Sequence, residues 1–454
     1  MSNMLKEALN KVFGKKKERF FEPSGYKIGV TTGIPSFDRA TVVQQTQMVV
    51  SKGTKVIQVD LEYPQSPTPH DIEEIKRIIK AQGLELTIHA ATNVTLPTTS
   101  AEKIDYELVD KDMKDYVKLC KKVGFKAINV HSSYLPSPFL MREYRRLSWN
   151  MVDENGDPIG EKLAKSEKAL EWFVNDRMEK ISFETKLVIL RNYLSKKEKI
   201  YGEELDKKLR SLSEREMEKL MKESIKDYYR ENPPTNLYEF EAYMIMAWWM
   251  YERGDELWRN IAGGKPPDKC EEKKLVDAVA GKYLQGHIKK LLKDLEDAKV
   301  ILLIENPDCR RKEFRGYHRL EKPIDIFYVV KSIDHPLVRM TIDFEHVATH
   351  GLNVEEEIKK MPQGSGEYVK MLHVGSYPSP AHLHHPVERD DVYLYRLMWH
   401  LRERGFKEGY IIFEWGGGRK EEERWLESVN ALKWMAMWLE RDVAPDDLPP
   451  EFFG

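Results

Sequence analysis

Three histidines lie close together between prolines in the segment SYPSPAHLHHPVERDD, residues 376–391. They are His382, His384 and His385, and the first two have the spacing H-x-H, which brings two imidazoles near each other. Histidine is the commonest protein ligand for metal ions, and flanking prolines restrict the backbone of the loop. A lone H-x-H is weak evidence of a metal site, so other ligand residues must reach the same place.

Six successive apolar runs of the chain end on a histidine or a carboxylate. A single residue of this kind most often makes a structural hydrogen bond or caps the next helix. Six in succession favour a shared metal site, because carboxylates that converge repel one another unless a cation or a proton lies between them. In chain order the terminal residues are His89, His131, Glu305, Asp343 with His346, His373 and Glu414.

The elements that must position these residues alternate along both ends of the chain. Eight strands, each followed by a helix, predict an α/β fold, the (β/α)8 TIM barrel, whose active sites lie at the carboxyl ends of the strands. Strands are expected at 27–33, 55–64, 84–91, 125–133, 299–307, 337–346, 368–378 and 409–418. Helices are expected at 39–53, 69–83, 111–124, 274–298, 324–333, 354–361, 390–405 and 421–442.

The alternation stops between residues 138 and 278, where helical runs rich in Lys, Glu, Leu, Tyr and Trp follow one another. We interpret this stretch as a mostly helical insertion after strand four, which overlies the catalytic face and sets specificity. Its first part, residues 149–160, indicates a hairpin or a series of turns. The remaining units are an N-terminal extension with a short amphipathic helix (1–26), the first half of the barrel (27–137), and the second half with a C-terminal helix (279–454).

Composition narrows the class of protein. The 73 Lys and Arg nearly balance the 75 Asp and Glu, so no global nucleic-acid footprint is present. The charged fraction of 33% is typical of a heat-adapted, thermophilic surface. Three widely spaced cysteines without C-x-x-C imply no disulfide framework and suit a cytoplasmic location. No run approaches the roughly 20 apolar residues of a membrane span, so no membrane partner is expected; the oligomeric state stays open.

The strand-end residues resemble those of the xylose-isomerase-like TIM barrels, a superfamily that includes endonuclease IV. The resemblance covers residues 27–137 and 280–420 and leaves out the insertion. In many members a Glu, Asp, His, Glu set on strands five to eight holds one divalent metal. Sugar isomerases and epimerases often use that set with manganese, cobalt or magnesium. The corresponding residues are Glu305, Asp343, His373 and Glu414.

The chain resembles the endonuclease IV branch most, in which three zinc ions are bound. That branch adds histidines on strands three and four, D-x-x-H on strand six and D-x-H after the strand-seven histidine. His382 departs from the pattern because it stands where D-x-H has Asp, which removes an anionic ligand from the third ion. The resemblance implies three ligand groups: His89, His131 and Glu305; Glu305, Asp343, His373 and Glu414; and His346, His382 and His384.

Two enzymatic hypotheses follow. The first is metal-dependent hydrolysis of a phosphoester, in a small phosphorylated substrate or in damaged DNA, with Glu305 and Glu414 shaping the site. Arg419, in EWGGGRK, adds charge for a phosphate, and His385 contacts the substrate or supports a ligand. For DNA, the segments 144–146 (YRR) and 227–230 (DYYR) are candidate contact faces, or else solvated helix surfaces.

The second hypothesis is isomerisation or epimerisation of a small sugar at a single metal ion. Glu305 and Glu414 would then shuttle a proton. A barrel kept as a scaffold without catalysis is a third reading, against which the complete set of ligand residues argues. His350 is interpreted as a structural or supporting residue rather than a ligand.

Overall fold

The computed structural model describes most of the chain. The described residues are 23–32, 41–50, 54–61, 68–90, 98–133, 136–137, 139–141, 148–309, 311–378, 380–414 and 424–453. The expected N-terminal helix, the segment 144–146 and Arg419 lie outside them.

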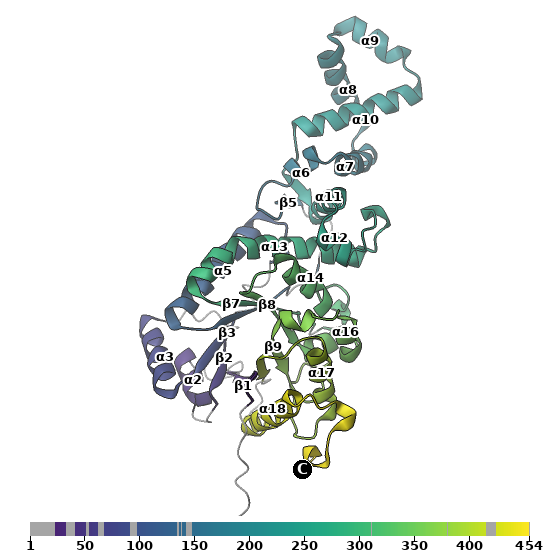
Figure 1. The fold of residues 1–454 in the computed structure, drawn as a ribbon. Coiled ribbons are helices and arrows are strands. Elements are labelled where there is room, and N and C mark those ends of the chain that lie inside the picture. Colours follow the sequence, from purple (N-terminus) through teal and green to yellow (C-terminus); the bar gives the residue numbers. More distant parts are fainter. Residues whose placement is uncertain are drawn as a thin grey trace, which may run out of the picture.

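Eight parallel strands form a closed barrel, in the order β1-β10-β9-β8-β7-β4-β3-β2, which confirms the predicted (β/α)8 fold (Figure 1). Their apolar runs are buried almost throughout, as expected for strands covered on both faces. The bounds are β1 Tyr26–Thr31, β2 Val56–Asp60, β3 Glu85–His89, β4 Ala127–His131, β7 Ile301–Glu305, β8 Val338–Asp343, β9 Val369–Val374 and β10 Gly409–Phe413.

The strand register sets the ends of neighbouring strands level with one another. His131 pairs with Glu305 between β4 and β7, and Asp343 pairs with His373 between β8 and β9. Because paired residues of parallel strands lie side by side, these four functional side chains begin at one rim of the barrel. The register therefore brings the strand-end residues together before any side chain is placed.

Helices cover the outside of the barrel at the expected places. The helix α3 shows why: Thr68 and Asp71 form a capping box at its start, and Gly83 ends it in the left-handed conformation. The bounds are α2 Val42–Val50, α3 Pro69–Gln82, α5 Lys103–Val123, α13 Glu272–Ala298, α14 Pro323–Ile333, α16 Val354–Lys360, α17 Val392–Glu403 and α18 Trp425–Glu440.

One predicted strand ends too late. The expected strand 337–346 stops at Asp343, and the next six residues form a short helix, α15 (Phe344–Thr349). The Asp343 side chain accepts a hydrogen bond from the backbone N–H of His346, so it caps this helix. Because this hydrogen bond starts the helix at Phe344, the strand cannot continue beyond Asp343.

The insertion between β4 and β7 is mostly helical, as predicted. Its segment 149–160 contains the expected turns, and Val152 and Pro158 form an antiparallel bridge around them. The preceding strand β5 (Ser148–Asn150) pairs antiparallel with β6 (Asn236–Tyr238), from later in the insertion. The helices are α6 Gly160–Lys165, α7 Glu167–Lys180, α8 Phe183–Glu198, α9 Gly202–Ser211, α10 Glu214–Glu231, α11 Glu239–Glu252 and α12 Glu256–Ile261.

Only the base of the insertion lies against the barrel. Figure 1 shows α8, α9 and α10 projecting away from the strands, with α11 and α12 between them and helix α13. At the base, the Tyr243 hydroxyl donates to the carbonyl of Thr99, and Arg319 forms an ion pair with Glu239. The expectation that the whole insertion overlies the catalytic face is therefore wrong for its outer helices, which pack on one another. Within the described residues, no helix is both long and apolar enough to cross a bilayer.

Candidate metal centre

Nine histidines and carboxylates gather where the strands end. They fall into the three groups expected from the sequence, and within each group the potential ligand atoms all lie within 4.8 Å of one another. A further overlapping group joins His89, His373 and Glu414. The full set is His89, His131, Glu305, Asp343, His346, His373, His382, His384 and Glu414.

Glu305 lies at the centre of the set and its side chain is fully buried. Its Oε2 is 3.2 Å from Nε2 of His89 and 3.2 Å from Nε2 of His131. Its other oxygen, Oε1, is 2.8 Å from Nδ1 of His373. One carboxylate thus faces the first group with one oxygen and the second group with the other, which is the geometry of a bridging ligand.

Two neutral side chains fix the orientation of Glu305. The amide of Asn129 donates to its Oε2, and the Thr341 hydroxyl donates to the Asn129 carbonyl oxygen over 2.6 Å. Such supporting hydrogen bonds hold a ligand in one orientation. The sequence analysis missed Asn129. Its position two residues before His131 on one strand, which puts both on the same face, could have revealed it.

The second group is built around Asp343 and His373. Nδ1 of His373 lies 2.8 Å from Oε2 of Glu414 and 3.8 Å from Oδ2 of Asp343. Asp343 uses Oδ1 to cap α15 and turns Oδ2, which has no hydrogen-bond partner, toward the group. The spacing D-x-x-H follows because Asp343 caps α15 by accepting a hydrogen bond from the backbone N–H three residues later, which belongs to His346.

The third group consists of His346, His382 and His384. His346 donates from Nδ1 to the carbonyl of Asn306 over 2.8 Å, which leaves Nε2 with a lone pair. That Nε2 is 3.1 Å from Nε2 of His382. Two imidazole nitrogens bound to one tetrahedral zinc would be about 3.3 Å apart, so this separation suits a shared ion.

The backbone of the histidine loop is strained. His382 and His384 both have positive φ, +54° and +41°, a region that residues other than glycine seldom occupy. The His384 N–H donates to Oε1 of Glu345 over 2.9 Å, and the His385 carbonyl accepts from the Ser376 N–H over 2.7 Å. A Cβ on Gly375 would lie 2.7 Å from Cα of His384. These contacts hold the loop in place.

Asp308 supplies a carboxylate near His382, where the sequence pattern lacks one. Its Oδ2 is 3.8 Å from Nδ1 of His382, on the side of the imidazole away from His346. A carboxylate behind a ligating imidazole raises the basicity of the ligand and orients its ring. The missing anionic ligand is thus partly replaced by a residue that the sequence analysis did not single out.

The pKa values follow from burying these groups together. Burial alone would lower the pKa of His89, but the hydrogen bond and charge of Glu305 outweigh it and raise the pKa to about 10. Burial raises the pKa of Asp343 well above its ordinary value, and the charges of Glu414 and Glu305 add to the effect. Burial lowers the pKa of His346 to about 4, so this ring stays neutral near pH 7. The site therefore favours extra positive charge between its carboxylates, as a proton or as a cation.

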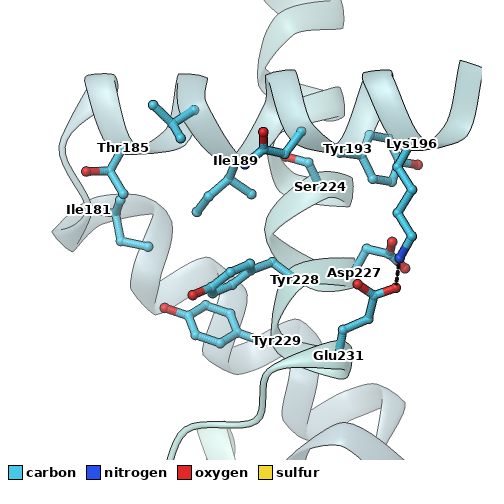
Figure 2. Close-up of a pocket in the computed structure, with 12 residues that line it drawn as sticks. Ile181, Thr185, Ile189, Tyr193, Lys196, Ser224, Asp227, Tyr228, Tyr229 and Glu231 are labelled. Atoms are coloured by element: carbon cyan, nitrogen blue, oxygen red, sulfur yellow. Dashed lines mark hydrogen bonds and ion pairs between the residues drawn. The ribbon is translucent and has the colours of Figure 1, made fainter. Parts of the chain in front are cut away.

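The other predicted contact residues lie apart from this centre. The His385 side chain is exposed, and only its backbone supports the loop. Residues 227–230 lie on α10, where Tyr228 and Tyr229 line a cavity of about 430 Å3 against α8 (Figure 2). Asp227 and Glu231 line the same cavity, and its one lysine, Lys196, pairs with Glu231. Two carboxylates and a paired amine do not favour a nucleic-acid phosphate there.

The comparison with known families identifies the second half of the barrel. Residues 260–435 match the family model described as the xylose isomerase-like TIM barrel. This second half of the barrel is therefore similar to that family. The matched residues contain seven of the nine members of the set, namely Glu305, Asp343, His346, His373, His382, His384 and Glu414.

The chain also has similarity to several solved structures at low sequence identity. A D-tagatose 3-epimerase-like protein is 13% identical, covering 92% of this chain and 100% of its own, with a TM-score of 0.49. The 3-keto-D-glucoside 4-epimerase from E. coli is 10% identical, covering 91% of this chain and 99% of its own, with a TM-score of 0.44. Endonuclease IV from Thermus thermophilus is 12% identical, covering 92% of this chain and 100% of its own, with a TM-score of 0.41. No curated protein matches the chain.

Proposed function

We propose that the protein is a zinc-dependent hydrolase that cleaves a phosphoester, and that damaged DNA is the first substrate to test. The number of ligand residues supports this proposal. One metal ion needs only the group of Glu305, Asp343, His373 and Glu414. Five further histidines complete two more groups at the same rim, an arrangement that a mononuclear enzyme does not require.

The donor atoms fit zinc. Six of the nine residues are histidines, and imidazole nitrogen with carboxylate oxygen is a usual zinc ligand set. Buried ligand atoms without a hydrogen-bond partner include Nε2 of His131, Oδ2 of Asp343 and Nε2 of His384. Since unpartnered buried polar atoms are rare in folded proteins, these atoms are accounted for most simply as metal ligands.

The charge balance suits an anionic substrate. Three divalent ions would bring six positive charges against the three carboxylates of the set, Glu305, Asp343 and Glu414. The excess positive charge would attract a phosphate group and stabilise negative charge that develops on it during the reaction. A neutral sugar would gain less from the same excess.

The protein side chains divide the remaining work. When bound, clustered divalent ions supply an activated water and neutralise charge on phosphoryl oxygens. Glu305 fixes the spacing between two ligand groups because Asn129 holds its carboxylate. Glu414 is the most exposed carboxylate, at 14% of its side chain, against 0% for Glu305 and Asp343. Glu414 is therefore the carboxylate best placed to accept a proton from the substrate side.

Metal counting and a cleavage assay test the proposal together. Elemental analysis of the purified protein should give two or three zinc ions per chain for the nine-residue set, in addition to any zinc bound elsewhere in the chain. The protein should then nick duplex DNA that contains an abasic site, or hydrolyse a small chromogenic phosphodiester. Full zinc occupancy without cleavage of either substrate would overturn the proposal.

A second candidate function is supported by the four-residue group alone. Nδ1 of His373 lies 2.8 Å from one oxygen of Glu305 and 2.8 Å from one oxygen of Glu414. The two carboxylates therefore lie on either side of the His373 ring nitrogen. With a single manganese, cobalt or magnesium ion, such a pair could move a proton between carbons of a sugar. One ion per chain, and exchange of a sugar C–H with solvent deuterium, would favour this alternative.

We also propose that the insertion, residues 138–278, affects specificity through its base. The contacts of Tyr243 with Thr99 and of Glu239 with Arg319 tie α11 to loops that follow β3 and β7. These loops border the mouth of the barrel. The outer helices α8, α9 and α10 project away from the strands (Figure 1).

A further inference from the structure

A separate group of ligand side chains lies beside the nine-residue set. Cys309, His318 and His350 offer ligand atoms that all lie within 4.8 Å of one another. Their exposed fractions are 3%, 4% and 5%, so all three are buried. They come from three places: the segment after β7, the loop before α14, and the residue that ends α15. The proposed hydrolysis uses none of them.

Hydrogen bonds prepare both imidazoles of this group as ligands. Nε2 of His350 donates to the carbonyl of Pro307 over 3.0 Å, and Nδ1 of His318 donates to the carbonyl of Phe314 over 3.3 Å. The other nitrogen of each ring then carries a lone pair.

Two buried acceptor atoms beside the group lack a hydrogen-bond partner. They are Nδ1 of His350 and Oε2 of Glu321, and they lie 3.4 Å apart. A lone pair and a carboxylate oxygen that face each other repel unless a proton or a cation lies between them. Buried atoms in this state are rare and call for a bound partner. This observation is independent of the cysteine and histidine spacing.

We propose that Cys309, His318 and His350 bind a zinc ion of their own, beside the carboxylate of Glu321. Thiolate and imidazole ligands select zinc over magnesium or calcium. On binding, the Cys309 thiol, which otherwise donates to the carbonyl of Arg311, releases its proton to the solvent. The thiolate and the Glu321 carboxylate then balance the two positive charges. The three ligands are buried and separate from the nine-residue set, so we assign the site a structural role.

The position of this zinc site gives it a role. His346 and His350 are one helical turn apart, and their rings donate to the successive carbonyls of Asn306 and Pro307. The same short segment carries Glu305 at one end and Cys309 at the other. A zinc ion on Cys309 and His350 would therefore lock the segment that positions Glu305 against α15.

The site also connects the insertion to this segment. His318 precedes Arg319, whose guanidinium pairs with Glu239 at the base of the insertion. The carbonyl of Tyr317 accepts a hydrogen bond from the Ser137 N–H over 2.7 Å. If His318 binds the ion, the loop that contains Tyr317, His318 and Arg319 is held both by the ion and by its contacts with Ser137 and Glu239. The inference does not depend on the reaction catalysed at the rim.

Cobalt substitution tests the proposal, because a thiolate bound to Co2+ gives a near-ultraviolet charge-transfer band. The nine-residue set contains no thiol, so this band reports the new site alone. The cobalt-loaded full chain should show the band. Cys309→Ser should abolish it and remove about one cobalt ion per chain. The control Cys270→Ser, at a half-buried cysteine outside the group, should leave both unchanged.

Two results would overturn the proposal. One is a cobalt-loaded wild-type protein that lacks the band while cobalt is bound at the rim. The other is a Cys309→Ser protein that keeps the band. If Cys309→Ser does not fold, X-ray absorption of the zinc-loaded wild-type protein gives the answer instead. A sulfur neighbour at about 2.3 Å from zinc supports the site, and only nitrogen and oxygen neighbours refute it.

Discussion

Oε1 of Glu305 and Nδ1 of His373 lie 2.8 Å apart, and both side chains are fully buried. Burial alone would raise the pKa of Glu305, but the charges of His373 and His131 hold it well below its ordinary value. The pair joins two ligand groups, because the other oxygen of Glu305 faces His89 and His131. Whatever reaction the rim catalyses, its geometry depends on this one carboxylate.

The first prediction concerns that carboxylate. Glu305→Gln keeps the size of the side chain but replaces one acceptor oxygen by an amide donor and removes the charge that a bridging ligand needs. Activity should fall by at least about 100-fold, since weaker changes around metal ligands already cost about 10–100-fold. Circular dichroism should show an unchanged fold. The matched control is Glu107→Gln, at an exposed glutamate on α5, and a Glu305→Gln protein that retained turnover would refute the bridging role.

The second prediction concerns the close approach of Gly375 to the histidine loop. Gly375→Ala would place a methyl carbon 2.7 Å from Cα of His384, a contact with backbone that a rotamer change cannot relieve. The loop should move, and zinc content should fall by the one ion assigned to His346, His382 and His384. Leu383→Ala is the control, because that side chain on the same loop is 45% exposed. Equal zinc content in the two variants would contradict the prediction.

The third prediction concerns the residue that departs from the family pattern. His382→Asp introduces the carboxylate that the resemblance leads one to expect, at a backbone φ of +54° that aspartate tolerates better than most residues. This variant should keep the third zinc ion, whereas His382→Ala should lose it. Zinc titration monitored by isothermal calorimetry distinguishes the two. If His382→Ala binds as many ions as the wild type, His382 is not a ligand.

The barrel and its rim could be predicted because the signal lies within single strands. A run such as AINVH is apolar enough to be a strand buried on both faces, and the ligand residue His131 stands at its end. Helix α15 could not be predicted, because six residues are too few to show a helical period. The direction in which the outer helices of the insertion project from the barrel could not be predicted from the sequence either.

The group around Cys309 shows a second limit of sequence analysis. Its three residues lie in loops at irregular spacing, and only the packing of α15 on the segment after β7 brings them together. His350 therefore looked structural when considered alone. The expectations of a heat-adapted and cytoplasmic protein rest on composition and stay predictions.

The last prediction concerns the dependence of stability on pH. Burial, and next the charge of Asp277, raise the pKa of Asp325 on α14 to about 7. The other charged groups that act on it are Lys273, Lys322 and Glu321. Because the folded state holds this proton more tightly than the unfolded state does, the contribution of Asp325 is fully present below about pH 4 and is lost as the pH rises to about 7.

Asp325→Asn should remove this dependence, since an amide stays neutral at every pH. The variant should gain stability over the wild type at about pH 8, by up to about 4 kcal/mol, and should differ less at about pH 4. Urea denaturation at both pH values measures the difference in free energy of unfolding. Asp297→Asn, at an exposed carboxylate near the end of α13, is the control and should shift both values equally. A wild-type protein whose stability rises between these pH values in parallel with Asp325→Asn would show that Asp325 is ionised in the folded state throughout.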